Sequence, residues 1–144
     1  MNKPLPDKWI RKAIIDVANG MIVNGVAIPV YANRLPPDAD ANHFVLISTQ
    51  TNTVNKYTKC GNAYESTVLL DVVTSFYGSG NILKKTIADD ILDKLRDLTD
   101  DLQLDVSSGL YIHRQTQSFP TDITTITPTE NIYRKFMRLE MFIN

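Results

Sequence analysis

The sequence of 144 residues is poor in cysteine, in histidine and in long apolar runs. Its single cysteine, Cys60, excludes an internal disulfide and a zinc site built from cysteines, because each needs more than one thiol. The longest apolar runs, such as residues 44–47, have four residues, whereas a membrane-spanning helix needs about 20. The N-terminal residues MNKPLPDKW lack an apolar segment, so we expect no secretory signal and no membrane partner.

Neither sign of charge is in excess. The 15 Lys and Arg residues are balanced by 16 Asp and Glu residues, which gives a net charge of −1. A dedicated DNA- or RNA-binding domain is normally clearly basic, so this balance argues against that class. The hydrophobic content of 43% is typical of a globular protein, and the length predicts one domain over residues 1–144.

Two segments have the apolar spacing of amphipathic helices. The first covers residues 6–18, and its apolar face comprises Ile10, Ala13, Ile14 and Val17. The second covers residues 81–98, and its longer apolar stripe comprises Leu83, Ile87, Ile91, Leu95 and Leu98. On another face of the second helix lie Asp89, Asp93 and Asp97, a pattern typical of a solvated surface.

The predicted strands are joined by short polar connections. Asn24-Gly25 predicts a tight type I′ hairpin between residues 21–23 and 26–28. Further strands are predicted over residues 43–53, 64–76, 102–106, 110–119 and 132–143. The Thr-rich segment 121–129 is expected to form a loop or arm. This order predicts an α+β fold, in which two helices pack on one face of a mainly antiparallel sheet.

Alternation assigns the faces of the two clearest strands. In residues 64–76, one face comprises Val68, Leu70, Val72 and Phe76, and the other comprises Glu65, Thr67, Asp71 and Ser75. In residues 132–143, the inward face comprises Tyr133, Met137, Leu139, Met141 and Ile143. The outward face of that closing strand carries Arg134, Arg138 and Glu140.

No residue pattern specifies a catalytic centre, a metal site or a cofactor. His43 and His113 lie far apart and outside any ligand motif, so we expect no metal role for either. Cys60 has Lys59 beside it but no accompanying base, and we expect it to be dispensable. One alternative is a small enzyme that uses Cys60 or the cluster of Asp89, Asp93 and Asp97. Another is a monomeric adaptor that binds a single host protein.

A family resemblance runs along nearly the whole chain. After the first helix, Ile28-Pro29-Val30-Tyr31 leads into the turn-rich residues 34–39 and a strand that begins at His43. The strand over 65–76, a glycine-initiated helix and the closing strand 132–140 follow. In this order the elements resemble the tail completion proteins of tailed bacteriophages, which are also called tail terminator or head–tail joining proteins.

The resemblance implies a non-enzymatic virion protein without catalytic residues or cofactors, made in the host cytoplasm. It implies a ring of six or twelve copies in the neck, connector or tail completion region, in contact with portal, neck or tail-tube proteins. DNA would pass through the ring without sequence-specific binding. Because loops on a rigid sheet usually supply recognition, the candidate interface residues are Thr51, Asn52, Asn55, Lys56, Tyr57, Lys59, Thr124, Thr125 and Thr127.

Overall fold

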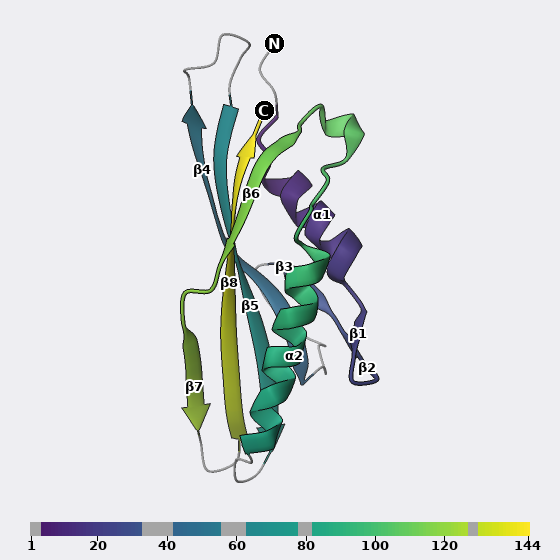
Figure 1. The fold of residues 1–144 in the computed structure, drawn as a ribbon, viewed down its shortest axis with the longest axis vertical. Coiled ribbons are helices and arrows are strands. Elements are labelled where there is room, and N and C mark those ends of the chain that lie inside the picture. Colours follow the sequence, from purple (N-terminus) through teal and green to yellow (C-terminus); the bar gives the residue numbers. More distant parts are fainter. Residues whose placement is uncertain (1–3, 33–41, 56–62, 78–81, 127–129) are drawn as a thin grey trace.

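Two α-helices lie on one side of a six-stranded sheet, and a separate two-stranded hairpin packs beside them (Figure 1). The computed structural model describes residues 4–32, 42–55, 63–77, 82–126 and 130–144. Its elements are α1 (Asp7–Ala18), β1 (Met21–Val23), β2 (Val26–Ile28), β3 (Val30–Ala32), β4 (His43–Asn55), β5 (Ala63–Tyr77), α2 (Ile82–Leu98), the 3-10 turn η1 (Val106–Ser108), β6 (Ile112–Ser118), β7 (Asp122–Ile126) and β8 (Glu130–Ile143). This arrangement confirms the predicted α+β class.

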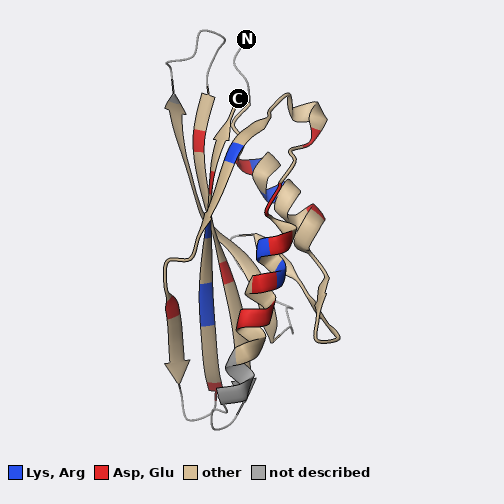
Figure 2. Ribbon diagram, in the orientation of Figure 1, with Lys and Arg blue, Asp and Glu red and all other residues tan. Residues whose placement is uncertain are grey.

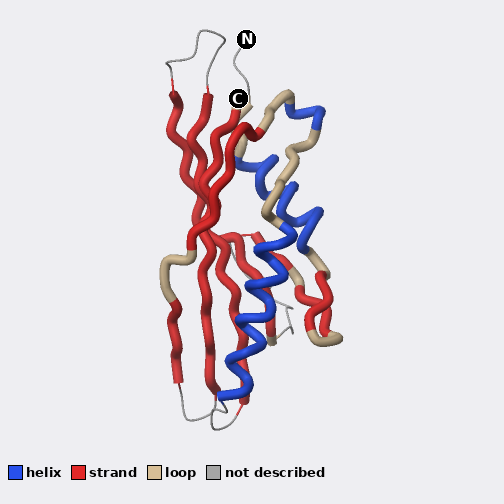
Figure 3. Tube along the Cα trace, viewed as in Figure 1, coloured by secondary structure: helices blue, strands red, loops and turns tan. Residues whose placement is uncertain are grey.

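The large sheet has the strand order β3-β4-β5-β8-β6, and β7 is a further partner of β8. All neighbours are antiparallel except β3 and β4, which run parallel. β6 pairs with residues 138–143 of β8 and β7 pairs with residues 131–135, so both strands share one edge of β8. Figure 3 shows how strongly the long strands twist about one another.

The core lies between the helices and the sheet face turned toward them. From the sheet it takes Val68, Leu70 and Val72 of β5 and the predicted inward residues of β8, all at most 8% exposed. α2 adds Ala88, Ile91 and Leu95, each completely buried. On α1, Val17 is predicted to be buried, but its side chain is 42% exposed and Ala18 is completely buried instead. Ile10, Ile14 and Ala18 follow one another at intervals of four residues, so they share the face of the helix that contacts the core.

The hairpin prediction is confirmed. β1 and β2 pair antiparallel around Asn24 and Gly25, whose φ angles of 51° and 81° are the positive values that a type I′ turn requires. The side-chain amide of Asn24 also donates to Asp90 of α2 at 3.0 Å. This contact ties the turn to the second helix.

Two predictions about the second half of the chain are wrong. Residues 102–105 form no strand, because Leu102 fills the core from an extended connection and the Asp105 carboxylate then caps η1. The predicted loop over 121–129 contains β7, whose Thr and Ile residues favour extended backbone and pair with β8. All five side chains of β7 are exposed, so no burial pattern marked it as a strand.

The polar character of β6 has a structural cause. Its helix-side residues Gln115 and Gln117 satisfy backbone groups at the C-terminal end of α2. The amide nitrogen of Gln117 donates to the Arg96 carbonyl at 2.9 Å, and that of Gln115 donates to the carbonyl of Thr99. The Gln115 oxygen accepts from the backbone N–H of Leu102 at 3.3 Å. These glutamines therefore serve the interior of the fold.

Replacing Gln115 by alanine should lower the free energy of unfolding by about 1–3 kcal/mol. The reason is that the carbonyl of buried Thr99 and the backbone N–H of Leu102 both lose their hydrogen-bond partner. Thr116→Ala is the matched control, since Thr116 is the exposed next residue of β6, and its effect should stay within about 0.5 kcal/mol. Urea denaturation of both variants measures the difference. Equal losses would show that the Gln115 contacts contribute nothing.

Candidate functional site

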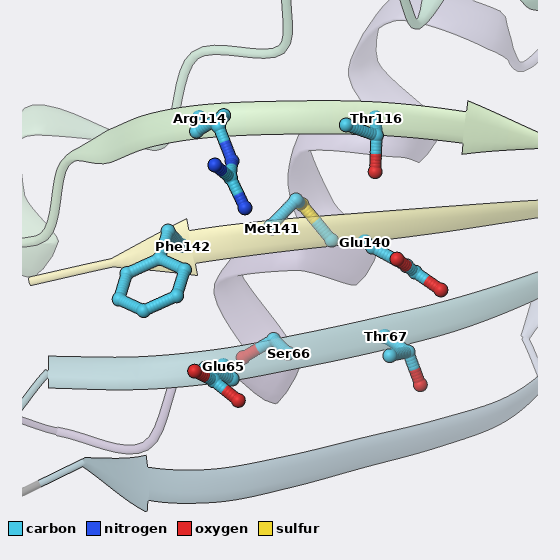
Figure 4. Close-up of a pocket in the computed structure, with 8 residues that line it drawn as sticks. All are labelled: Glu65, Ser66, Thr67, Arg114, Thr116, Glu140, Met141 and Phe142. Atoms are coloured by element: carbon cyan, nitrogen blue, oxygen red, sulfur yellow. The ribbon is translucent and has the colours of Figure 1, made fainter.

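The sheet face turned away from the helices is open over the half that contains the ends of β5, β6 and β8. We call this region the outer groove; it encloses about 340 Å³. Its lining comprises Glu65, Ser66, Thr67, Arg114, Thr116, Glu140, Met141 and Phe142 (Figure 4). A second hollow of about 430 Å³ continues it toward Thr49 and Thr51 of β4, past Arg138.

Charges of both signs line the outer groove. Glu65 and Glu140 supply carboxylates, and Arg114 supplies a guanidinium group that lies over the ring of Phe142 at 6.0 Å. All three charged side chains are exposed. Such a surface offers ion pairs, hydrogen bonds and an aromatic face to a partner, which is the chemistry of an interface.

The other half of the outer face holds a buried ion pair. Asp71 was expected on the polar face of its strand, yet its side chain is completely buried. The Arg134 guanidinium donates to the Asp71 carboxylate through two nitrogens, with Nε at 3.1 Å from Oδ2. This hydrogen bonding raises the pKa of Arg134 above its ordinary value. Phe44 and Val73, at 8% and 9% exposure, make this half of the face apolar.

A β-bulge in β4 decides where several candidate interface residues point. The register shifts between Ile47 and Thr49, so Gln50 and Asn52 turn toward the helices. The Asn52 side chain donates to the Asp7 carboxylate and accepts from the hydroxyl of Ser66. Asn52 therefore joins α1 to the sheet.

The remaining candidate interface residues lie apart from one another. Thr51 is exposed near the end of β4, and its hydroxyl is hydrogen-bonded to that of Thr67. Thr124 and Thr125 are exposed on β7, at the opposite end of the molecule (Figure 1). Asn55 is the last residue of β4. Outside the described residues lie Lys56, Tyr57, Lys59, Cys60 and Thr127.

The acidic face of α2 is mostly solvated, as predicted, with acidic and basic positions interleaved along the helix (Figure 2). Asp93 and Asp97 are exposed. Asp89 instead pairs with Lys135 of β8, whose side chain is 18% exposed and also lies 3.5 Å from the Asp122 carboxylate. The hydrogen bond to Asp89 raises the pKa of Lys135. Asp89 thus links the helix to the sheet.

The two histidines lie in different surroundings. Burial lowers the pKa of His43, at the start of β4. His113 is exposed on β6, where its ring contacts the side chain of Asn144. Within the described ranges, no three His, Cys, Asp or Glu side chains are grouped so that they could hold a metal ion. Neither described helix has the length and apolarity needed to cross a membrane.

Comparison with known proteins shows similarity at the level of the fold. No family model matches the chain, and no curated protein matches it. Among solved structures, it is similar to a chain of "Virion of native gene transfer agent (GTA) particle". The two chains are 14% identical, superpose with a TM-score of 0.50, and are each covered over 78% of their length. At this level of identity the similarity shows a shared fold.

Proposed function

We propose that this protein is a structural component of a phage-like virion, and that its copies form a ring in the head–tail connector or tail completion region. The observation that carries the proposal is the fold shared with a chain of a gene transfer agent virion, over 78% of both chains. The resemblance of the element order to tail completion proteins supports the same assignment. The protein would be made in the host cytoplasm and incorporated into the virion as a single domain.

The surfaces of the molecule suit repeated contacts with neighbours. The outer groove is open and carries both signs of charge, and β7 is exposed along all five residues. Contacts between different patches of identical copies close into a ring when the rotation per step is right. We infer six or twelve copies, with portal, neck or tail-tube proteins on either side.

The charge balance fits a ring through which DNA passes. With a net charge of −1, the protein has little overall attraction for the phosphate backbone. Such a lining would let DNA move without being retained, and without sequence-specific binding. Thr51, Thr124 and Thr125 are the described candidates for contacts with other subunits or partners.

Electron microscopy of intact particles tests this proposal. We expect the chain in a closed ring around the DNA channel, between head and tail components. Its absence from purified virions, or its presence as isolated copies on the capsid exterior, would overturn the proposal. Light scattering on the chain mixed with portal or tail proteins gives a second test, because an adaptor or enzyme would remain monomeric beside them.

A further inference from the structure

The half of the large sheet that carries the outer groove has two open edges. On one side, β3 pairs only with Val45–Ile47 of β4, so residues 49–55 have β5 as a neighbour and no described strand on their other side. On the opposite side, β6 has β8 as its single described neighbour. Figure 1 shows β4 and β6 as the outer strands of the upper half of the sheet. Along both edges, the backbone groups that point away from the sheet have no partner among the described residues, so each edge can accept another strand.

The two edges carry matching rows of exposed side chains. One row crosses all four strands of this half and comprises Thr51, Thr67, Glu140 and Thr116. The rows on either side of it end in Thr49 and Ser118, and in Thr53 and Arg114. All six side chains at the ends of these rows are exposed. Because paired residues lie directly opposite one another, the two edges are at the same level of the sheet.

The strand directions allow one edge to pair with the other edge of a neighbouring copy. β4 and β8 run in one direction, and β5 and β6 run in the opposite direction, because each neighbouring pair is antiparallel. A rotation about an axis along the strands brings β4 of the next copy beside β6 without reversing it. The two strands are then antiparallel, and their matching rows require no displacement along the axis. Contacts of this kind, between different edges of identical copies, close into a ring when the rotation is right.

The β4 edge lacks the charges and prolines that commonly prevent strand addition. Residues 49–55 read TQTNTVN, with no charged residue and no proline. Hydroxyl groups that face one another on antiparallel strands form hydrogen bonds, as those of Thr51 and Thr67 do within the chain. On β6, Thr116 and Ser118 carry the same groups. The β6 edge of a second copy therefore supplies both backbone partners and matching side chains.

We propose that β4 of one copy pairs antiparallel with β6 of the next copy, so that the large sheet continues from subunit to subunit around the ring. Thr51 lies opposite Thr116 in this contact, and the flanking rows pair in the same way. Backbone hydrogen bonds supply the affinity, and the facing hydroxyl groups favour this register. The inference rests on the proposed ring and names the contact between its neighbouring subunits.

Cysteine cross-linking in assembled particles tests the contact directly. In a Cys60→Ser chain, Thr51→Cys combined with Thr116→Cys places one thiol on each edge. Within one copy β5 and β8 lie between these positions, so their Cα atoms are roughly 14 Å apart, beyond the reach of a disulfide. Across the proposed contact the Cα atoms are about 4.5–5.5 Å apart, so an added oxidant should link neighbouring copies. Denaturing gels without reductant should then show a ladder from dimer up to the complete ring.

A matched control combines Thr51→Cys with Thr125→Cys, because Thr125 is another exposed threonine on the same side of β8. It lies opposite Ile132, whereas Thr116 lies opposite Glu140, so the two positions are roughly 27 Å apart along the strand. The control pair should give no ladder. If microscopy of the same particles shows a ring but the Thr116 pair gives no more ladder than the control, the strand contact is wrong and the ring stands. If the particles contain no ring, both proposals fail.

Charged substitutions at the same two positions provide an independent measurement. Thr51→Lys with Thr116→Lys places like charges directly opposite each other, which should weaken each contact about fivefold and reduce incorporation into particles. Thr51→Glu with Thr116→Lys places opposite charges there and should be incorporated normally. Thermal unfolding of the two isolated double variants should be similar, since both residues are exposed and lie on different edges of one copy. Equal incorporation of the two variants would overturn the inference.

Discussion

Replacing Arg134 by alanine is expected to lower the free energy of unfolding by about 2–4 kcal/mol. The reason is Asp71, whose side chain is completely buried and would be left charged without its partner. Arg134 itself is 39% exposed, so water can enter after its removal, and we place the loss below the upper limit for a fully buried pair. Denaturation at neutral pH measures it.

The control for this prediction lies on the same strand and the same face. Arg138 is exposed on β8, and Arg138→Ala should change the free energy of unfolding by no more than about 0.5 kcal/mol. Replacing both partners, as Asp71→Leu with Arg134→Met, should cost less than Arg134→Ala alone, because no buried charge remains. A double variant that is less stable than the single one would show that the ion pair contributes net stability.

Ile91→Ala is the second substitution with a large expected effect, a loss of about 2–5 kcal/mol. Ile91 is completely buried on α2, in the middle of the core between that helix and the sheet. Truncation removes apolar contacts and leaves a cavity that rigid neighbours such as Leu70 and Met137 fill only in part. The unfolding midpoint in urea or on heating should fall markedly.

Asp93→Ala tests the face assignment of the same helix. Asp93 is exposed, and its removal should leave the unfolding midpoint almost unchanged. Alanine is also the better helix former, which works against any loss. Similar losses for Ile91→Ala and Asp93→Ala would contradict the packing of α2 described above.

The two halves of the outer face have different physical roles. Around Asp71 and Arg134 the face is buried, so removal of one partner there should affect folding. Around Glu65, Arg114 and Glu140 it is open and charged, so substitutions there should affect assembly more than folding. Comparing variants of the two halves therefore distinguishes an assembly defect caused by unfolding from one caused by the loss of a contact with a neighbouring molecule.

Both helices, the hairpin and the long strands follow from local sequence patterns. An amphipathic helix or a half-buried strand is marked by residues close in sequence, as in the stripe of Ile87, Ile91 and Leu95. Asn24-Gly25 specified its turn because few other residue pairs adopt positive φ at both positions. The α+β class follows from the order of these elements.

Other features depend on pairing between segments that are far apart in the sequence. Residues 122–126 form a strand because β8 offers an edge, and the bulge near Ser48 turns Gln50 and Asn52 toward α1. Asp71 is buried because register brings Arg134, 63 positions away, to its carboxylate. Likewise, Gln115 and Gln117 of β6 donate to carbonyls at the C-terminal end of α2. No local pattern records such partners, since their energies arise only when the chain has folded.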